Sequence, residues 1–483
     1  MRVAGPAALV CAAVVAAGCG GMKGVGAGAS DLAPATAPMF IALDTDSGSS
    51  QWKTVDRLAS HFPDKQKAID SLKRNLRRQD GIDWERDAKP ALGKELDFVW
   101  LDFDNNGQDF VALMQPKDEG KFKQLVAKGN AKDPSRRLLY EKFHGWEVLA
   151  EKQATIDRFK QESGSATATL TDDPAFKHSM DKLGSDAIVR AYVNGEEIMR
   201  LARQYGGASA RRLIDKAGTL DWIALKLGAT SNGLGLDTIV HGTPGKLFQG
   251  LSPSRTFNPK LTESTPQDAL LYLTFHGSKN LFANLQKNPV LNTPVVRRFS
   301  GVLRQIGTVL QGENAFYVRA ASGRFPEVTF VAAPGGGTDG AAVVDRLLAR
   351  YRAQLKVVPQ RTTVAGTSTR RLGFGEVAVY YANVNGKLVI TDLPAGIRGV
   401  KSGGKPLAQE ETYRDAAEAS GLPHRTQGFL YVNIHSTVPF IEKLSQTRLP
   451  DEVSRNLRPL YSAVEYAVSR SHEIQITFFL RIK

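Results

Sequence analysis

Runs of apolar residues alternate along the chain with stretches in which apolar positions recur at helical spacing. The first apolar run, residues 39–43, predicts a strand, and residues 52–78 repeat apolar positions every three or four residues with one break. The runs 96–104 and 109–115 flank an asparagine–glycine turn at 105–107, which predicts a hairpin. Antiparallel hairpins separated by helices predict an α+β fold, mainly of antiparallel sheet with flanking helices.

The order strand, helix, hairpin recurs late in the chain. Residues 186–240 contain it, and residues 428–480 contain it again. The residues that match at a common distance of 239 positions are Tyr192 and Asn194 in the first copy and Tyr431 and Asn433 in the second. Within each half a smaller strand–helix–hairpin unit occurs twice. The sequence therefore predicts two tandem homologous halves, an internal duplication.

A proline-rich stretch without hydrophobic period separates the two predicted halves. It contains four prolines: Pro244, Pro253, Pro259 and Pro266. We therefore expect a first α+β repeat at 39–243, a connection at 244–267 and a second α+β repeat at 268–483.

The first residues have the pattern of an exported lipoprotein. Arg2 precedes a short run of small apolar residues that ends at Gly18, immediately before Cys19. Such a run is too short to span a membrane and resembles a lipoprotein signal, in which the cysteine receives the lipid. We expect a signal peptide at 1–18, lipidation of Cys19 and a flexible tether at 19–38. The alternative is a simple secretory signal without a lipid.

These expectations place the protein in the cell envelope, anchored by lipid to the outer face of the cytoplasmic membrane. The net charge of +14 then favours anionic partners, either an envelope polymer or lipid headgroups. A basic surface that keeps the protein soluble is the alternative, and export argues against nucleic acid. Since Cys11 lies in the predicted signal peptide and Cys19 would carry lipid, we expect no disulfide and no cysteine-based metal site in the body.

One turn-rich segment resembles a calcium loop. Asp102, Asp104 and Asn106 occupy alternate positions before Gly107, as the first oxygen ligands of such a loop do. The twelfth position holds Leu113 in place of the usual glutamate. The three residues are therefore calcium candidates, and a hairpin turn rich in turn-forming residues is the alternative.

A glycine-rich segment at 335–340 has the spacing of a dinucleotide-binding loop. Pro334 separates it from the preceding predicted strand, which is the second arm of a hairpin. A flexible loop is therefore the favoured interpretation. We expect no cofactor and, apart from the calcium candidates, no metal.

The sequence contains no recognisable catalytic motif. Gly-x-Ser-x-Gly, His-Glu-x-x-His and a lysine-containing phosphate loop are all missing from it. We therefore assign no catalytic residues and expect a non-enzymatic binding or scaffold protein for an envelope component, which would be an anionic polymer, a lipid or a protein. Two alternatives stay open: an extracytoplasmic hydrolase with a non-standard site, and a carrier of an apolar ligand between the two halves.

Three segments suggest a family resemblance. They are Gln51-Trp52 after the first predicted strand, residues 81–93 before the next strand, and the Ala-Tyr-Val-Asn segment that ends at Asn194. With them the chain resembles an uncharacterised family of bacterial, mostly actinobacterial, envelope lipoproteins defined as a domain of unknown function. The resemblance covers nearly the whole body and implies an exported, often lipid-anchored protein. It implies no activity and no site residues.

Overall fold

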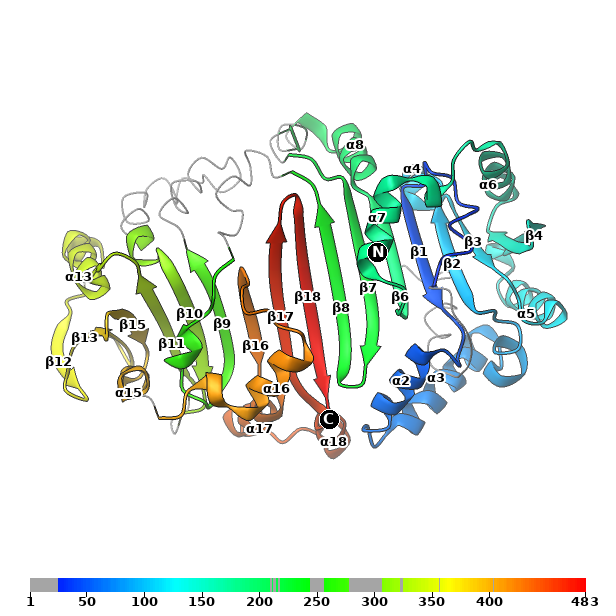
Figure 1. The fold of residues 1–483 in the computed structure, drawn as a ribbon. Helices are drawn as coiled ribbons and strands as arrows, with labels where there is room; N and C mark the ends of the chain where they lie inside the picture. Colours follow the sequence, from blue (N-terminus) through cyan, green and yellow to red (C-terminus); the bar gives the residue numbers. More distant parts are fainter. Residues whose placement is uncertain are drawn as a thin grey trace. The chain divides into compact units, whose positions relative to one another are not determined.

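The computed structural model describes residues 25–208, 211, 214–215, 218–243, 256–277, 306–321, 325–355, 357–402 and 404–483 (Figure 1). The chain forms two compact units. Unit 1 comprises residues 1–211 and 219–242 with residue 483, and unit 2 comprises residues 212–218 and 243–482. The predicted signal peptide and Cys19 lie outside the described residues.

Unit 1 is built on an antiparallel sheet. Its strands are β1 (Met39–Asp44), β2 (Glu95–Trp100), β3 (Phe110–Met114), β4 (Leu139–Phe143), β5 (Trp146–Ala150), β6 (Val189–Asn194), β7 (Trp222–Thr230) and β8 (Gly233–His241). Across the sheet they follow the order β4-β5-β3-β2-β1-β6-β7-β8 (Figure 1). The first strand of the chain is therefore central in the sheet of unit 1.

The helices of unit 1 connect these strands. They are α2 (Ser50–Ala59), α3 (Lys65–Asp80), α4 (Asp104–Gly107), α5 (Glu119–Lys132), α6 (Gln153–Ser165), α7 (Pro174–Leu183) and α8 (Gly195–Tyr205). Asp173 caps α7, because its carboxylate accepts the backbone N–H groups of Ala175 and Phe176 and Pro174 suits the first helical position. α6 and α7 cover a core that includes Phe40, Val99, Phe159, Phe176 and Tyr192.

Residues 25–38, which we call the N-terminal strap, pack against unit 1. Three of its alanines are almost completely buried: Ala29, Ala33 and Ala37. Leu170 donates its backbone N–H to the carbonyl of Ala33 at 2.9 Å. The flexible tether predicted at 19–38 is therefore wrong for the strap, because the small residues that suggested flexibility allow close packing instead. Residues 19–24 lie outside the described residues.

Unit 2 is also built on an antiparallel sheet. Its strands are β9 (Ala269–Gly277), β10 (Gly312–Arg319), β11 (Glu327–Pro334), β12 (Gln360–Val364), β13 (Thr367–Phe374), β14 (Val377–Val384), β15 (Lys387–Thr391), β16 (Gly428–Val432), β17 (Leu460–Arg470) and β18 (Glu473–Ile482). Their order is β12-β13-β14-β15-β11-β10-β9-β16-β17-β18 (Figure 1).

The helices of unit 2 are α13 (Gly340–Arg350), α14 (Arg352–Leu355), α15 (Pro394–Ser402), α16 (Glu411–Ala419), α17 (Ile434–Ser445) and α18 (Asp451–Leu457). α15 and α16 cover one face of the sheet, over a core that includes Tyr272, Tyr317, Ile397, Ala416, Tyr431 and Val464. α13 packs in a separate cluster with Leu347, Tyr381 and Leu388, on the face of β14 and β15 opposite to α15.

The strand pairings of unit 1 recur in unit 2. β1 pairs with β2 and β6, and β9 pairs in the same way with β10 and β16. The residues that face one another at the centre of each sheet are Val99, Phe40 and Tyr192 in unit 1 and Tyr317, Tyr272 and Tyr431 in unit 2. These registers define corresponding positions. Unit 2 has in addition the hairpin β12–β13.

The α+β class with mainly antiparallel sheet is confirmed, since every strand pairing described within the two units is antiparallel. Tight two-residue turns close corresponding hairpins. His144 and Gly145 join β4 to β5 with φ of 48° and 84°, and Asn385 and Gly386 join β14 to β15 with φ of 51° and 77°. Among the described residues, no helix has the length and apolar character needed to cross a membrane.

Candidate functional site

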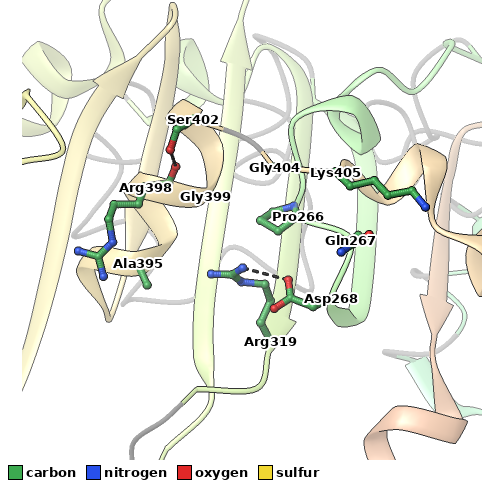
Figure 2. Close-up of a pocket in the computed structure, with 10 residues that line it drawn as sticks. All are labelled: Pro266, Gln267, Asp268, Arg319, Ala395, Arg398, Gly399, Ser402, Gly404 and Lys405. Carbon is green, nitrogen blue, oxygen red and sulfur yellow. Dashed lines mark hydrogen bonds and ion pairs between the residues drawn. The ribbon is translucent and has the colours of Figure 1, made fainter.

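A pocket of about 430 Å³ opens on unit 2 (Figure 2). The segment that leads into β9, the end of β10, one side of α15 and the segment after α15 form its walls. The residues that line it are Pro266, Gln267, Asp268, Arg319, Ala395, Arg398, Gly399, Ser402, Gly404 and Lys405. No local motif marks these separate segments, which explains why sequence reasoning missed the pocket.

Arg319 holds the central charge of the pocket. Its Nε and Nη2 donate to the two carboxylate oxygens of Glu327 at 3.0 and 2.7 Å, and its Nη1 donates to Asp268 at 2.9 Å. The side chains of Arg319 and Glu327 are 14% and 2% exposed. Burial alone would lower the pKa of Arg319, but the contacts with Glu327 and Asp268 outweigh it and raise the pKa. The guanidinium is therefore fixed and its charge is compensated.

Two further cations border the pocket. Arg398 and Lys405 are exposed, and within the described residues neither has an ion-pair partner. Figure 2 shows the side chain of Lys405 extending away from Arg319. A small anion is the class of ligand that this lining suits, but solvent screens the attraction that exposed cations offer.

One wall of the pocket is rigid. α15 lies so close to the sheet that a Cβ at Gly396 would stand 2.4 Å from the hydroxyl oxygens of both Thr329 and Thr391. The Thr329 hydroxyl donates to that of Thr391 at 2.9 Å. Because no side chain fits at Gly396, the position of α15 against β11 and β15 is fixed by this contact.

A second feature of unit 2 is a sheet face with half-exposed apolar side chains. In β9, Tyr272 is buried in the core, and its neighbours Leu271 and Leu273 point to the opposite face. We call the apolar residues on that side of three strands the open face: Leu271, Leu273, Phe275, Leu430, Val432, Ile476, Phe478 and Leu480. Leu273 and Phe478 are each 38% exposed, and the others are half-buried.

The open face is continuous across the strands. Leu273 lies opposite Leu430 of β16, Leu430 lies opposite Glu465 of β17, and Glu465 lies opposite Phe478 of β18. Directly opposed side chains in antiparallel strands contact one another. The exposed Glu465 is the charged residue in this row, so the open face is an apolar surface that contains one carboxylate.

α17 presents further exposed apolar side chains on unit 2. Asn433 caps α17, because its side chain accepts the backbone N–H of Ser436 at 3.0 Å. All residues of α17 and α18 are described and none is buried. Ile441 and Leu444 of α17 are 51% and 38% exposed. α17 contacts β9 and β17, and thus lies beside strands that carry the open face or adjoin it.

Unit 1 contains a cluster of aromatic and ionisable side chains. His241 Nδ1 lies 2.8 Å from Asp221, and its ring stacks on Trp222 with centroids 5.1 Å apart. The His178 ring lies 6.4 Å from that of His241 and joins α7 to β8. An aspartate that orients a histidine is one part of a hydrolytic site.

The corresponding positions in unit 2 favour a structural function for this cluster. Asp415 and Arg481 correspond to His178 and His241, and they form a two-contact ion pair at 2.9 and 3.2 Å between α16 and β18. In both units, side chains at these positions thus connect a helix to the last strand. The cluster therefore gives little support to the hydrolase alternative.

The calcium candidates have other partners. Residues 104–107 form the single turn α4 between β2 and β3. Asp102 pairs with Arg158, and Asp104 accepts a hydrogen bond from the Tyr205 hydroxyl at 3.0 Å. The side chain of Asn106 lies outside the described residues. In the described part of the chain, no group of three or more acidic, histidine or cysteine side chains could hold a metal, so the geometry does not favour calcium here.

The glycine-rich segment before α13 does not resemble a phosphate site. Asp339 caps α13 and accepts the backbone N–H of Ala342 at 3.1 Å. A carboxylate thus occupies the helix N-terminus where a nucleotide phosphate would bind, and it would repel one.

Comparison with known proteins gives little further information. No family model matches the sequence, and no match was found among curated proteins. Two solved structures show a likeness, crystal forms IV and III of TP0453, at 14% and 13% sequence identity. They cover 44% and 45% of this chain and 76% and 78% of TP0453, with TM-scores of 0.27 and 0.26. A likeness at this level carries no argument about fold or function.

Proposed function

We propose that the protein is a non-enzymatic, lipid-anchored protein of the bacterial cell envelope, and that unit 2 binds the acyl chains of an amphiphilic lipid on the open face. The observation that carries the proposal is the open face itself, a continuous apolar surface on which Leu273 and Phe478 are each 38% exposed. Connected apolar side chains that stay exposed are typical of interaction sites.

An acyl chain suits this surface better than a charged polymer does. The open face consists of aliphatic and phenylalanine side chains in cross-strand rows, and each methylene group removed from water stabilises a complex by about 0.8 kcal/mol. The net charge of +14 favours an anionic headgroup over a neutral one. In this proposal the apolar ligand lies on unit 2 and not between the two halves, and an anionic lipid is the preferred envelope component.

We also infer that the two units arose by duplication, with the repeats at 39–243 and 268–483 joined by 244–267. The shared order of strand pairings supports this inference, because each pairing described for unit 1 has a counterpart in unit 2. The matching caps support it too. Asn194 caps α8 and Asn433 caps α17, each by accepting a backbone N–H three residues on.

Lipid binding can be tested with a fluorescent fatty acid, cis-parinaric acid, and the full chain carrying Cys19→Ser so that an attached lipid does not compete. Replacing Leu273 and Phe478 together by Gln should weaken binding at least tenfold. The matched control replaces Phe374 and Val377 by Gln, since these are 52% and 55% exposed at the β13–β14 turn and lie outside the open face. Equal affinities for the two variants would contradict the proposal.

The anchor needs a separate test. Mass spectrometry of the N-terminal peptide from the natural membrane fraction should show a diacylglyceryl group on Cys19, and Cys19→Ser should move the protein to the soluble fraction. An N-terminus without lipid would overturn the anchor and would leave the open face to be judged by fatty-acid binding alone.

A further inference from the structure

Two charged residues bind the start of the N-terminal strap: Glu95, which is half-buried, and Arg190, which is buried. The carboxylate of Glu95, in β2, accepts the backbone N–H of Gly26 at 2.7 Å. Arg190, in β6, donates from Nε to the carbonyl of Val25 at 2.8 Å, and its Nη2 also bonds that carbonyl. Nη1 of Arg190 bonds the Gly184 carbonyl at 3.4 Å. The strap is therefore held through its backbone by one acid and one base.

The shape of the strap fits this position closely. Gly26 has a φ of +86°, and a Cβ there would stand 2.6 Å from the Cβ of Ala42 in β1. A larger residue would therefore need both an unfavourable backbone conformation and displacement of the strap from β1. The contacts continue further along, where Ala35 donates its backbone N–H to Ala168 at 3.3 Å.

In unit 2, a glutamate at the corresponding position holds the segment that precedes the first strand of that unit. Glu313 corresponds to Glu95, and its carboxylate accepts the backbone N–H groups of Lys260 and Leu261 at 2.8 to 3.0 Å. Leu407 donates its N–H to Thr265 at 2.7 Å, just as Leu170 donates to Ala33 in unit 1. A carboxylate that holds the backbone ahead of the first strand is thus a shared device. In unit 1 the segment held is the one that follows Cys19.

We propose that Glu95 and Arg190 form a latch that sets the distance between unit 1 and the lipid at Cys19. The latch rests on the anchor proposed above. While the strap is held, the chain from Cys19 to Val25 spans at most about 20 Å. When the strap is released as far as Met39, the same tether reaches up to about 70 Å. A strap that stays held by the latch therefore limits how far unit 1 can stand from the membrane.

The latch holds the strap by a different kind of interaction from that of the strap's alanines. The alanines of the strap contribute apolar burial, which is not directional. Glu95 and Arg190 contribute directional bonds with charged partners, each of which is stronger than a bond between neutral groups. Their loss should therefore free the start of the strap first and make release of its alanine-rich part easier.

Hydrogen–deuterium exchange tests whether these residues hold the strap. In the mature lipidated protein, Glu95→Gln combined with Arg190→Met should speed amide exchange in residues 25–38 about tenfold or more. Gly26→Val should do the same from the strap side without altering either charged residue. The matched control, Glu313→Gln, should speed exchange near Lys260 and leave the strap unchanged.

Fluorescence resonance energy transfer tests the distance between unit 1 and the membrane. Ala154→Cys, at an exposed position of α6, would supply a free thiol for a dye, because Cys19 carries lipid in the mature protein. In vesicles that contain an acceptor lipid, both latch variants should lower the transfer efficiency relative to wild type, and Glu313→Gln should not.

The outcomes separate the latch from the anchor. Unchanged exchange in the strap, or faster exchange with unchanged transfer, would overturn the latch while the anchor stands. A wild-type protein that does not attach to vesicles would overturn the anchor, and with it the control of distance, whatever the exchange data show.

Discussion

The two units bury an arginine in opposite ways. Arg319 of unit 2 makes direct ion pairs with Glu327 and Asp268. Arg190 of unit 1 is 7% exposed and gives its bonds to backbone carbonyls, although Glu95 and Asp97 act on it through space. The difference leaves Asp97 fully buried, with no hydrogen-bond partner for its carboxylate among the described residues.

Corresponding positions show which charge is common to both units. Glu95 and Glu313 correspond, and each holds the segment ahead of its sheet. Asp97 and Arg190 of unit 1 correspond instead to Ala315 and Phe429 of unit 2, which are buried in an apolar core. Asp97 and Arg190 are therefore particular to unit 1, where they lie beside a glutamate that has a counterpart in unit 2.

The largest predicted effect is the loss of Arg190. Arg190→Met removes the cation that faces Glu95 and Asp97, so we expect the free energy of unfolding of unit 1 to fall by about 3–5 kcal/mol. Denaturant titration followed by amide exchange would report on each unit separately. Peptides of unit 2 should keep their wild-type protection.

A double substitution tests the same comparison more sharply. Arg190→Phe with Asp97→Ala reproduces the unit 2 pair, and it removes the buried cation and the unpaired acid together. We expect the double variant to lose less than half of the unfolding free energy that Arg190→Met loses, because it leaves fewer buried charges without an opposite charge nearby. If the double variant were as unstable as the single one, the unit 2 arrangement would not be transferable.

Much of the fold could be predicted from the sequence, because local patterns determine it. The Asn385-Gly386 turn and the apolar run before Asn194 mark their elements without tertiary information. The N-terminal strap could not be predicted, since small residues favour flexibility in isolation and close packing when a sheet face is present. Its partners, Glu95 and Arg190, lie 69 and 165 positions away along the chain.

The candidate site was less predictable than the fold. A motif search finds candidate ligands that are close in sequence, such as Asp102 and Asp104. In the structure these two side chains instead contact Arg158 and Tyr205. The open face depends on which side of each strand the helices cover, and that is a property of the assembled unit. Alternation in β9 could have shown two apolar faces, but not that one of them stays half exposed.

The next prediction concerns the ion pair between Arg319 and Glu327 of unit 2. Glu327→Gln leaves the largely enclosed Arg319, whose side chain is 14% exposed, with Asp268 as its remaining carboxylate partner, and the Asp268 side chain is 57% exposed. We expect unit 2 to lose about 2–3 kcal/mol of unfolding free energy, because a buried charge loses its best partner. Thermal unfolding with unit-specific exchange would measure the loss. A change below about 0.5 kcal/mol, as for ordinary surface positions, would contradict the assigned importance of the pair.

A further prediction also replaces an acid by its amide, but here we expect the free energy of unfolding at neutral pH to rise and not to fall. Burial and the negative charge of Glu95 raise the pKa of Asp97 well above its usual value, and Arg190 opposes this in part. Folded unit 1 thus binds this proton more tightly than the unfolded chain does. The stability involved is present below the unfolded pKa of about 3.9 and is lost as the pH rises through the folded pKa.

Asp97→Asn should therefore match wild type near pH 4 and exceed it near pH 7. The pH slope of unfolding free energy should fall by up to about 1.4 kcal/mol per pH unit, the equivalent of one proton. Asp44, whose burial raises its pKa to about 6, leaves a residual slope in both proteins. Denaturant titrations at several pH values measure the slopes. An Asn variant that is less stable at pH 7 would show that Arg190 needs the Asp97 charge.

The smallest predicted effect exchanges the helix-to-strand contacts of the two units. His178→Asp with His241→Arg copies the Asp415–Arg481 ion pair into unit 1. The side chain of His241 is 28% exposed, so solvent screens the new pair and we expect a gain of about 0.5 kcal/mol that shrinks as salt is added. Thermal unfolding at two salt concentrations would measure it. A lower stability would mean that the stacking of His241 on Trp222 stabilises unit 1 more than an ion pair can. The side chains at these positions would then correspond in location but not in their contribution to stability.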